Sequence, residues 1–186
     1  HLSIRRQRQM CIRDRIMETQ GPADGADPLQ HYLGVVADKT GSLIAASAQF
    51  GAMLAGAPSE QINTLAAFGE KIGITFQLVD DVIDIASQSH ESGKTPGTDL
   101  KEGVPTLVTL NVMKSTRPQD RDLQELLKGP ISDQNVINQV LDQLRAHPAL
   151  DQSREQLLDI ANQARNLLRP LPVNDATGAL FSLCDA

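Results

Sequence analysis

The chain has 186 residues, which suffices for one domain with a hydrophobic core and is short for two. Hydrophobic residues make up 40% of it, aromatic residues only 3%, and there is no Trp, so aliphatic side chains must form most of the core. The formal net charge of −6 argues against nucleic acid as a partner, and without an apolar run of ~18 residues we expect no integral membrane segment. The two cysteines, Cys11 and Cys184, have neither metal-site nor disulfide spacing, which favours a cytoplasmic, reducing setting.

Residues 1–15 differ in charge from the rest of the chain. They contain five Arg and one Asp, a local charge of +4, which leaves −6 − 4 = −10 for the other residues. They lack the apolar run and the small-residue cleavage site of a signal peptide. A basic arm that binds RNA or an anionic membrane is one interpretation. We favour a non-native Arg-rich segment, so that the domain comprises residues 16–186.

Helical periodicity dominates the remaining sequence, and no strand pattern interrupts it. An Ala-rich helix is expected over 29–55, with Gly41 and Gly51 as points of close packing or of a local break. The next helix begins with Ser59 as its predicted N-cap and ends near residue 89, and a loop containing Gly and Pro follows over 90–105. Shorter helices are predicted over 106–115, 120–127, 133–145, 151–168 and 175–184. The predicted fold class is all-α.

The helix that starts near Ser59 has the most regular pattern in the chain. Its apolar residues recur at steps of three and four, the spacing of one buried stripe. The predicted stripe consists of Ile62, Leu65, Gly69, Ile72, Phe76, Val79, Ile83 and Ala86. With ~100° of rotation per residue, Gln77, Asp80, Asp81 and Asp84 share a polar face that borders this stripe. We therefore expect the three carboxylates to line the wall of a cavity.

Three carboxylates this close together repel one another. They lie in the last turns of the helix, where the macrodipole disfavours anions, and Asp80 and Asp84 form an i,i+4 like-charge pair that costs roughly 0.2–0.5 kcal/mol. A divalent cation reverses this penalty, and Mg²⁺ takes one or two carboxylates while keeping waters and substrate phosphates in its other positions. A solvated acidic face is the alternative. A calcium loop is excluded, because the D-x-[DN]-x-[DN]-G pattern with its later Glu is absent.

The loop that follows contains a lysine among glycines. Lys94 comes directly after Gly93, and Gly97 lies three residues further on. Glycine lets the backbone approach an anion, and lysine supplies a point charge for phosphate. The letters SGKT suggest a P-loop, but that motif needs a strand before it and a glycine where this chain has Gln88. We therefore predict a phosphate-binding lysine in a loop after a helix.

With these residues in place, the chain resembles the C-terminal part of a trans-isoprenyl diphosphate synthase (polyprenyl synthase), most of all those of actinobacteria. The second aspartate-rich motif of that family is matched by Phe76-Gln77, Asp80-Asp81-Val82-Ile83-Asp84, Gly93-Lys94, Gly97, Asp99-Leu100 and Thr106-Leu107. Upstream, Lys39-Thr40-Gly41 matches the Lys-Thr element of the family on the preceding helix. The first motif of the family, DDxxDxxxxRR, is nowhere in the 186 residues, and Val104 stands where a basic residue is often found.

The resemblance implies an isoprenoid-synthase helical bundle of which this chain is the C-terminal portion, with the N-terminal helices missing and the fragment inactive by itself. The implied reaction is the Mg²⁺-dependent condensation of an allylic diphosphate with isopentenyl diphosphate in isoprenoid biosynthesis, carried out by a homodimer when complete. Asp80 is the implied direct Mg²⁺ ligand, and Asp81 and Asp84 bind the ion directly or through water. The residues implied in binding the allylic diphosphate are Lys39, Thr40, Gln77 and Lys94.

Three other classes of protein share part of this pattern. A non-catalytic subunit that pairs with a prenyl synthase would usually have lost the second motif, which is kept here. A class I terpene cyclase shares the all-α cavity, but its second metal motif has Asn/Asp, Ser/Thr and Glu in place of the paired aspartates. A plain helical interaction domain with an acidic face would show no stabilisation by Mg²⁺ together with pyrophosphate. The Phe-Gln and Asp-Asp pairs favour the synthase.

Overall fold

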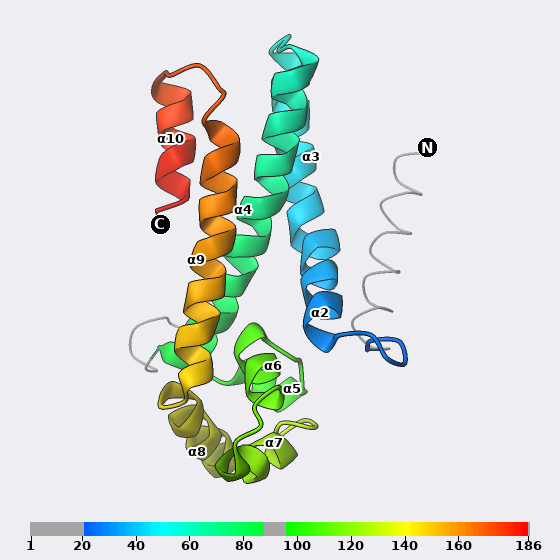
Figure 1. Ribbon diagram of the computed structural model, residues 1–186, viewed down its shortest axis with the longest axis vertical. Helices are drawn as coiled ribbons and strands as arrows, with labels where there is room; N and C mark the ends of the chain where they lie inside the picture. Colours follow the sequence, from blue (N-terminus) through cyan, green and yellow to red (C-terminus); the bar gives the residue numbers. More distant parts are fainter. Residues whose placement is uncertain (1–20, 88–95, 186) are drawn as a thin grey trace. The chain divides into compact units, whose positions relative to one another are not determined.

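The computed structural model describes residues 21–87 and 96–185, and all the regular secondary structure in these ranges is helical (Figure 1). The all-α prediction is therefore confirmed for this part of the chain. The Arg-rich segment 1–15 and Lys94 lie outside the described residues. Within residues 21–87 and 96–185, every helix is too short or too polar to cross a membrane.

The first predicted helix is continuous but irregular. It consists of α2 (Pro28–Val36), a π-helical turn η1 (Ala37–Gly41) and α3 (Ser42–Leu54), and α4 (Ser59–Ala86) follows it. The Asp27 carboxylate accepts a hydrogen bond of 2.9 Å from the Leu29 N–H and caps α2. Pro28 fits the first helical position because its missing N–H has no partner there in any helix.

The second half of the chain contains shorter helices. These are α5 (Thr98–Glu102), α6 (Leu107–Met113), the 3₁₀ turn η2 (Pro118–Asp120), α7 (Arg121–Leu126), α8 (Gln134–Arg145), α9 (Pro148–Leu168) and α10 (Asp175–Leu183). Side-chain caps from Thr106, Asp133 and Asn174 fix the starts of α6, α8 and α10. The predicted loop over 90–105 was wrong at α5, and α9 begins at Pro148, three residues before its predicted start.

The described residues form two compact units. Unit 1 contains residues 21–77 and 158–185, and unit 2 contains residues 78–157. Both α4 and α9 supply residues to the two units, since their residue ranges include the boundaries.

Close helix packing in unit 1 depends on glycine. A Cβ on Gly69 would lie 2.8 Å from the Ala45 Cα, and a Cβ on Gly73 would lie 2.8 Å from the Gly41 Cα. Real Cβ atoms do not approach this closely, so the two glycines of α4 let its backbone touch the helix formed by η1 and α3, which runs beside it (Figure 1). The prediction of close packing at Gly41 is confirmed.

The apolar core of unit 1 joins α4 to the end of the chain. Phe68 is buried against Ala164 and Leu168 of α9. Side chains of the following segment and of α10 complete this core, among them Leu171, Leu180 and Phe181.

Unit 2 has a larger core, built around α8. Its buried residues come from the end of α4 through to the start of α9: Val82, Ile85, Leu100, Val108, Val112, Leu123, Ile131, Ile137, Val140, Leu141, Leu144, Ala149 and Leu150. The Arg145 guanidinium donates hydrogen bonds of 2.8 Å to the carbonyl oxygens of Ile85 and Ser87. A cation bound to the last carbonyls of a helix stabilises its negative end, so Arg145 fixes the end of α4 from α8.

The predicted buried stripe of α4 was wrong in phase over the C-terminal part of the helix, although Gly69 is buried as predicted and Ile72 packs against the core of unit 1. Phe76 is 67% exposed and Ile83 is 41% exposed, whereas Leu78, Val82 and Ile85 are buried. The buried positions thus lie one residue earlier, about 100° around the helix. Residues of both stripes are apolar, so the pattern alone could not decide which stripe the rest of the chain covers.

This packing predicts opposite effects for two glycine substitutions. Gly69→Ala should lower the free energy of unfolding by about 1–3 kcal/mol, because its Cβ would meet the backbone of α3. Gly51→Ala is the matched control: it lies in α3 with open space around its Cβ position, and should raise stability by roughly 0.5–1 kcal/mol. Chemical denaturation of both variants measures the difference, and equal effects would contradict the packing.

Candidate functional site

The Lys-Thr element lies in the π-helical turn of unit 1. Lys39 and Thr40 fall within η1, where the helix widens for one turn. The Thr40 hydroxyl donates a hydrogen bond to the Oε1 atom of Gln77, at 3.4 Å. Turns of this kind occur often at functional sites, because the widened turn presents side chains and backbone groups that a regular helix would not. Three residues predicted for diphosphate binding are therefore close to one another.

The contact between Thr40 and Gln77 follows from the glycine packing. Gly41 directly follows Thr40, and the Cα of Gly41 lies against the position that a Cβ on residue 73 would occupy. The two backbones are thus close enough for side chains on adjacent positions to meet. Lys39 is exposed, and Thr40 and Gln77 are half-buried.

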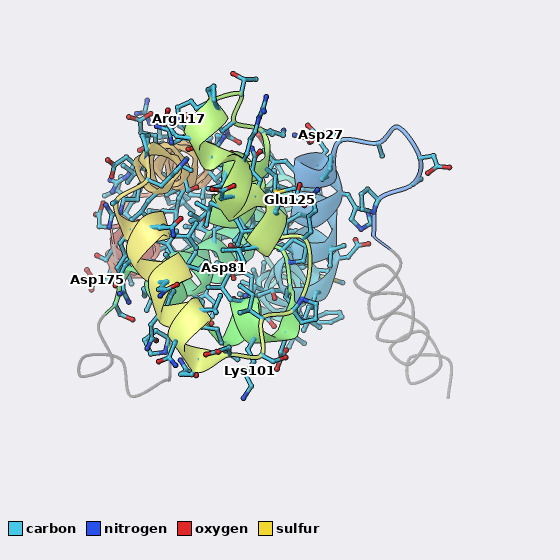
Figure 2. The ribbon with its side chains drawn as sticks, turned by 90° about the horizontal axis from the view of Figure 1, so that it is seen from below. Asp27, Asp81, Lys101, Arg117, Glu125 and Asp175 are labelled. Carbon is cyan, nitrogen blue, oxygen red and sulfur yellow. The ribbon has the colours of Figure 1, made fainter. Side chains whose placement is uncertain are left out.

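The three aspartates of the motif lie on the last turns of α4, within unit 2. Asp81 is only 7% exposed, and Asp80 and Asp84 are half-buried. The prediction placed all three on a polar face, but the shifted phase of the buried stripe puts Asp81 on the covered side. Figure 2 shows Asp81 among the helices of unit 2, whereas the exposed Lys101 of α5 points away from them.

Asp84 contacts the start of α5. Its Oδ2 atom accepts a hydrogen bond of 3.2 Å from the Gly97 N–H. The N–H groups of Thr98 and Asp99 also face this carboxylate. Burial raises the pKa of Asp84 above its usual value and the nearby Asp80 adds to the increase, while the three backbone N–H groups oppose it.

Asp99, in the first turn of α5, completes a group of four carboxylates. We call Asp80, Asp81, Asp84 and Asp99 the acidic cluster. Burial first, and then the negative charges of Asp81 and Asp84, raise the pKa of Asp99 to about 6. Burial and the neighbouring carboxylates together thus disfavour the ionised form of Asp99.

The chemistry of the acidic cluster fits a hard divalent cation. Carboxylate oxygens are the ligands that Mg²⁺ and Ca²⁺ prefer, and a cation among them would relieve the repulsion that adds to the effect of burial on the pKa of Asp99. No three His, Cys, Asp or Glu side chains in the part of the chain that the structure describes converge closely enough to hold a metal ion by themselves. Mg²⁺ does not need such a cage, because it binds through one or two carboxylates with substrate phosphates and waters.

The sequence prediction missed Asp99 as a member of this cluster. It was named only as part of the matched family motif, without a role. The local signal was the Gly97-Thr98-Asp99 string: Gly97 takes a left-handed conformation (φ +83°) and precedes α5, which puts Asp99 in the first helical turn. Only the fold shows that this turn meets the end of α4.

The raised pKa of Asp99 predicts how stability depends on pH. Because the folded-state pKa of about 6 lies above the ordinary value of 3.8, the folded chain binds more protons between these two pH values, and the free energy of unfolding falls as the pH rises through this window. Asp99→Asn removes the titrating group. After allowance for solvent screening at a half-buried carboxylate, it should be more stable than the parent by about 1 kcal/mol at pH 7, and equally stable below pH ~4.

Denaturation at a series of pH values measures this difference. The control is Asp159→Asn, which changes an exposed carboxylate of α9. A constant difference between Asp99→Asn and the parent across the window would contradict the charge crowding.

Comparisons with known proteins agree on one family. The family model described as polyprenyl synthetase matches residues 8–144. Nonaprenyl diphosphate synthase and dimethylallyltranstransferase of Mycobacterium tuberculosis are each 41% identical to this chain over 174 residues, which cover 94% of this chain and 52% of either protein.

Solved structures give the same result for the fold. A geranylgeranyl pyrophosphate synthase from Corynebacterium glutamicum, complexed with calcium and isoprenyl diphosphate, superimposes with a TM-score of 0.87 at 38% identity. The match covers 95% of this chain and 55% of that one. The chain therefore spans about half the length of the proteins it matches.

Proposed function

Because this chain belongs to the polyprenyl synthetase family, we propose that the whole protein is a Mg²⁺-dependent prenyltransferase. It condenses an allylic diphosphate with isopentenyl diphosphate in isoprenoid biosynthesis. The observation that carries this proposal is the acidic cluster at the end of α4, in which burial and like charges raise the pKa of Asp99 to about 6. Such a cluster is costly in a folded protein unless a cation and its anionic ligand belong beside it.

The proposed reaction begins with cleavage of the C–O bond between the allylic group and its diphosphate. Negative charge then builds on the departing pyrophosphate, and a bound divalent cation supplies the charge that stabilises it. The allylic carbon forms a new C–C bond with the double bond of isopentenyl diphosphate, and a proton is lost to pyrophosphate. The protein contributes by positioning and charge neutralisation, with little covalent chemistry of its own.

Each residue of the motif has a proposed task. Asp80 binds the cation directly, and Asp81 and Asp84 bind it directly or through water. The half-buried position of Asp80, beside the more covered Asp81, supports this order. The remaining residues bind or orient the allylic diphosphate: Lys39, Thr40, Gln77 and Lys94. The hydrogen bond between Thr40 and Gln77 supports a shared task for these two.

We also propose a homodimer and a cytoplasmic location for the whole protein. The family resemblance supports the first. The spacing of its two cysteines supports the second, because it offers no disulfide framework.

Removal of the Asp80 carboxylate tests the metal assignment. In the full-length protein, Asp80→Ala should lower kcat/KM by a factor on the order of 10³ or more, because it removes a ligand of the cation whose positive charge stabilises the leaving group. The stabilisation of the parent by Mg²⁺ together with pyrophosphate, measured as a shift in Tm, should also disappear. The control Asp159→Ala removes an exposed carboxylate from α9 and should change neither quantity. Unchanged turnover in Asp80→Ala would remove Asp80 from the metal site.

Removal of the Lys94 charge tests the phosphate assignment. Lys94→Ala should lower kcat/KM for the allylic diphosphate by about 10- to 100-fold, since a charge-assisted hydrogen bond to phosphate contributes roughly 1.5–3 kcal/mol. Lys101→Ala is the control, because Lys101 is exposed on α5 and points away from unit 2 (Figure 2). Equal effects of the two substitutions would contradict a specific role for Lys94.

A further inference from the structure

The start of α5 is capped by a side chain from another helix. The first N–H groups of a helix have no partners within it, and a side chain at the N-cap residue usually accepts one of them. The N-cap residue of α5 is Gly97, which has no side chain to do so. The carboxylate of Asp84, thirteen residues earlier, accepts the Gly97 N–H instead.

The fold excludes a local cap at this position. Gly97 has a φ of +83°, which side chains disfavour, and a Cβ there would lie 2.6 Å from the Cγ2 atom of Ile137 in the core. A Ser, Thr, Asp or Asn at position 97 would therefore collide with α8. The cap has to come from elsewhere, and Asp84 at the end of α4 provides it.

The other contacts of α5 hold its middle and its end. Leu100 is buried in the core of unit 2, and its carbonyl oxygen accepts a hydrogen bond of 3.0 Å from the Ile131 N–H. Gly103 ends the helix with a φ of +71° against Pro130. The Asp84 carboxylate, which accepts the Gly97 N–H and faces the N–H groups of Thr98 and Asp99, contacts the first turn, which carries Asp99.

We propose that Asp84 is a positioning residue of the acidic cluster: it holds the backbone at the start of α5 and thereby keeps Asp99 beside Asp80 and Asp81. The inference rests on the proposed function, in which the acidic cluster binds a cation with a diphosphate. For Asp84 alone, it replaces the cation-binding task proposed above: Asp84 acts through the backbone of α5, while Asp80 contacts the ion.

Two substitutions separate this task from that of a metal ligand. Asp84→Asn keeps an acceptor oxygen at the same distance from the backbone, and Asn caps helices about as well as Asp. Asp84→Glu keeps the charge and the ability to bind Mg²⁺, but its carboxylate is displaced by one methylene. A positioning residue should tolerate Asn better than Glu, whereas a metal ligand should tolerate Glu better than Asn.

The first measurement is amide hydrogen exchange of Gly97, Thr98 and Asp99 in the full-length protein, without cation or substrate. Exchange should be within about threefold of the parent in Asp84→Asn and about tenfold faster in Asp84→Glu, the effect of losing one hydrogen bond. In the control Asp80→Asn, exchange at these amides should match that of the parent. Parent-like exchange in Asp84→Glu would overturn the proposal.

The second measurement is kcat/KM for the same variants. We expect Asp84→Asn to retain at least about tenfold more activity than Asp84→Glu. The reverse ranking would overturn the proposal and make Asp84 a ligand. The exchange experiment involves no catalysis, so its failure is distinguishable from failure of the proposed function, which Asp80→Ala tests.

Discussion

Repulsion among the carboxylates at the end of α4 is the constraint that the packing of unit 2 has to overcome. The chain places Asp80, Asp81 and Asp84 within two turns, and the fold adds Asp99 from α5. Such a group keeps its geometry only if the backbone around it is fixed, because the charges by themselves would separate. The core around Val82 and Ile85 fixes α4, and Leu100 fixes α5. The free energy of packing in unit 2 thus offsets the repulsion within an arrangement that is unfavourable without a cation.

The same division between scaffold and site appears in unit 1. Gly41, Gly69 and Gly73 remove side chains where two helices cross, and the resulting approach brings Thr40 to Gln77. The glycines bind nothing in the proposed reaction. Their contribution is to set the distance between the helices that carry the binding residues.

The sequence predicted the fold class and the family better than the packing. The all-α class, the motif on α4 and the family resemblance are confirmed, since each depends on patterns within short segments. The phase of the buried stripe was wrong, because α4 has two apolar stripes and only tertiary contacts choose between them. The five-residue helix α5 was missed, because its glycine-flanked sequence is that of a loop. The membership of Asp99 in the acidic cluster depends on this helix and could not be predicted without it. The roles of Lys39, Lys94 and the aspartates stay predictions.

The guanidinium of Arg145 gives the end of α4 a counter-ion that never leaves. It donates hydrogen bonds to the carbonyl oxygens of Ile85 and Ser87 and is covalently part of the chain. Under the proposed function, the aspartates one or two turns earlier receive an exchangeable counter-ion, which arrives with substrate and departs with pyrophosphate. If the proposed function holds, one helix would carry a permanent cation at its terminus and a transient one on its side. Turnover would then empty the second position without unwinding the helix, because the first is built into the protein.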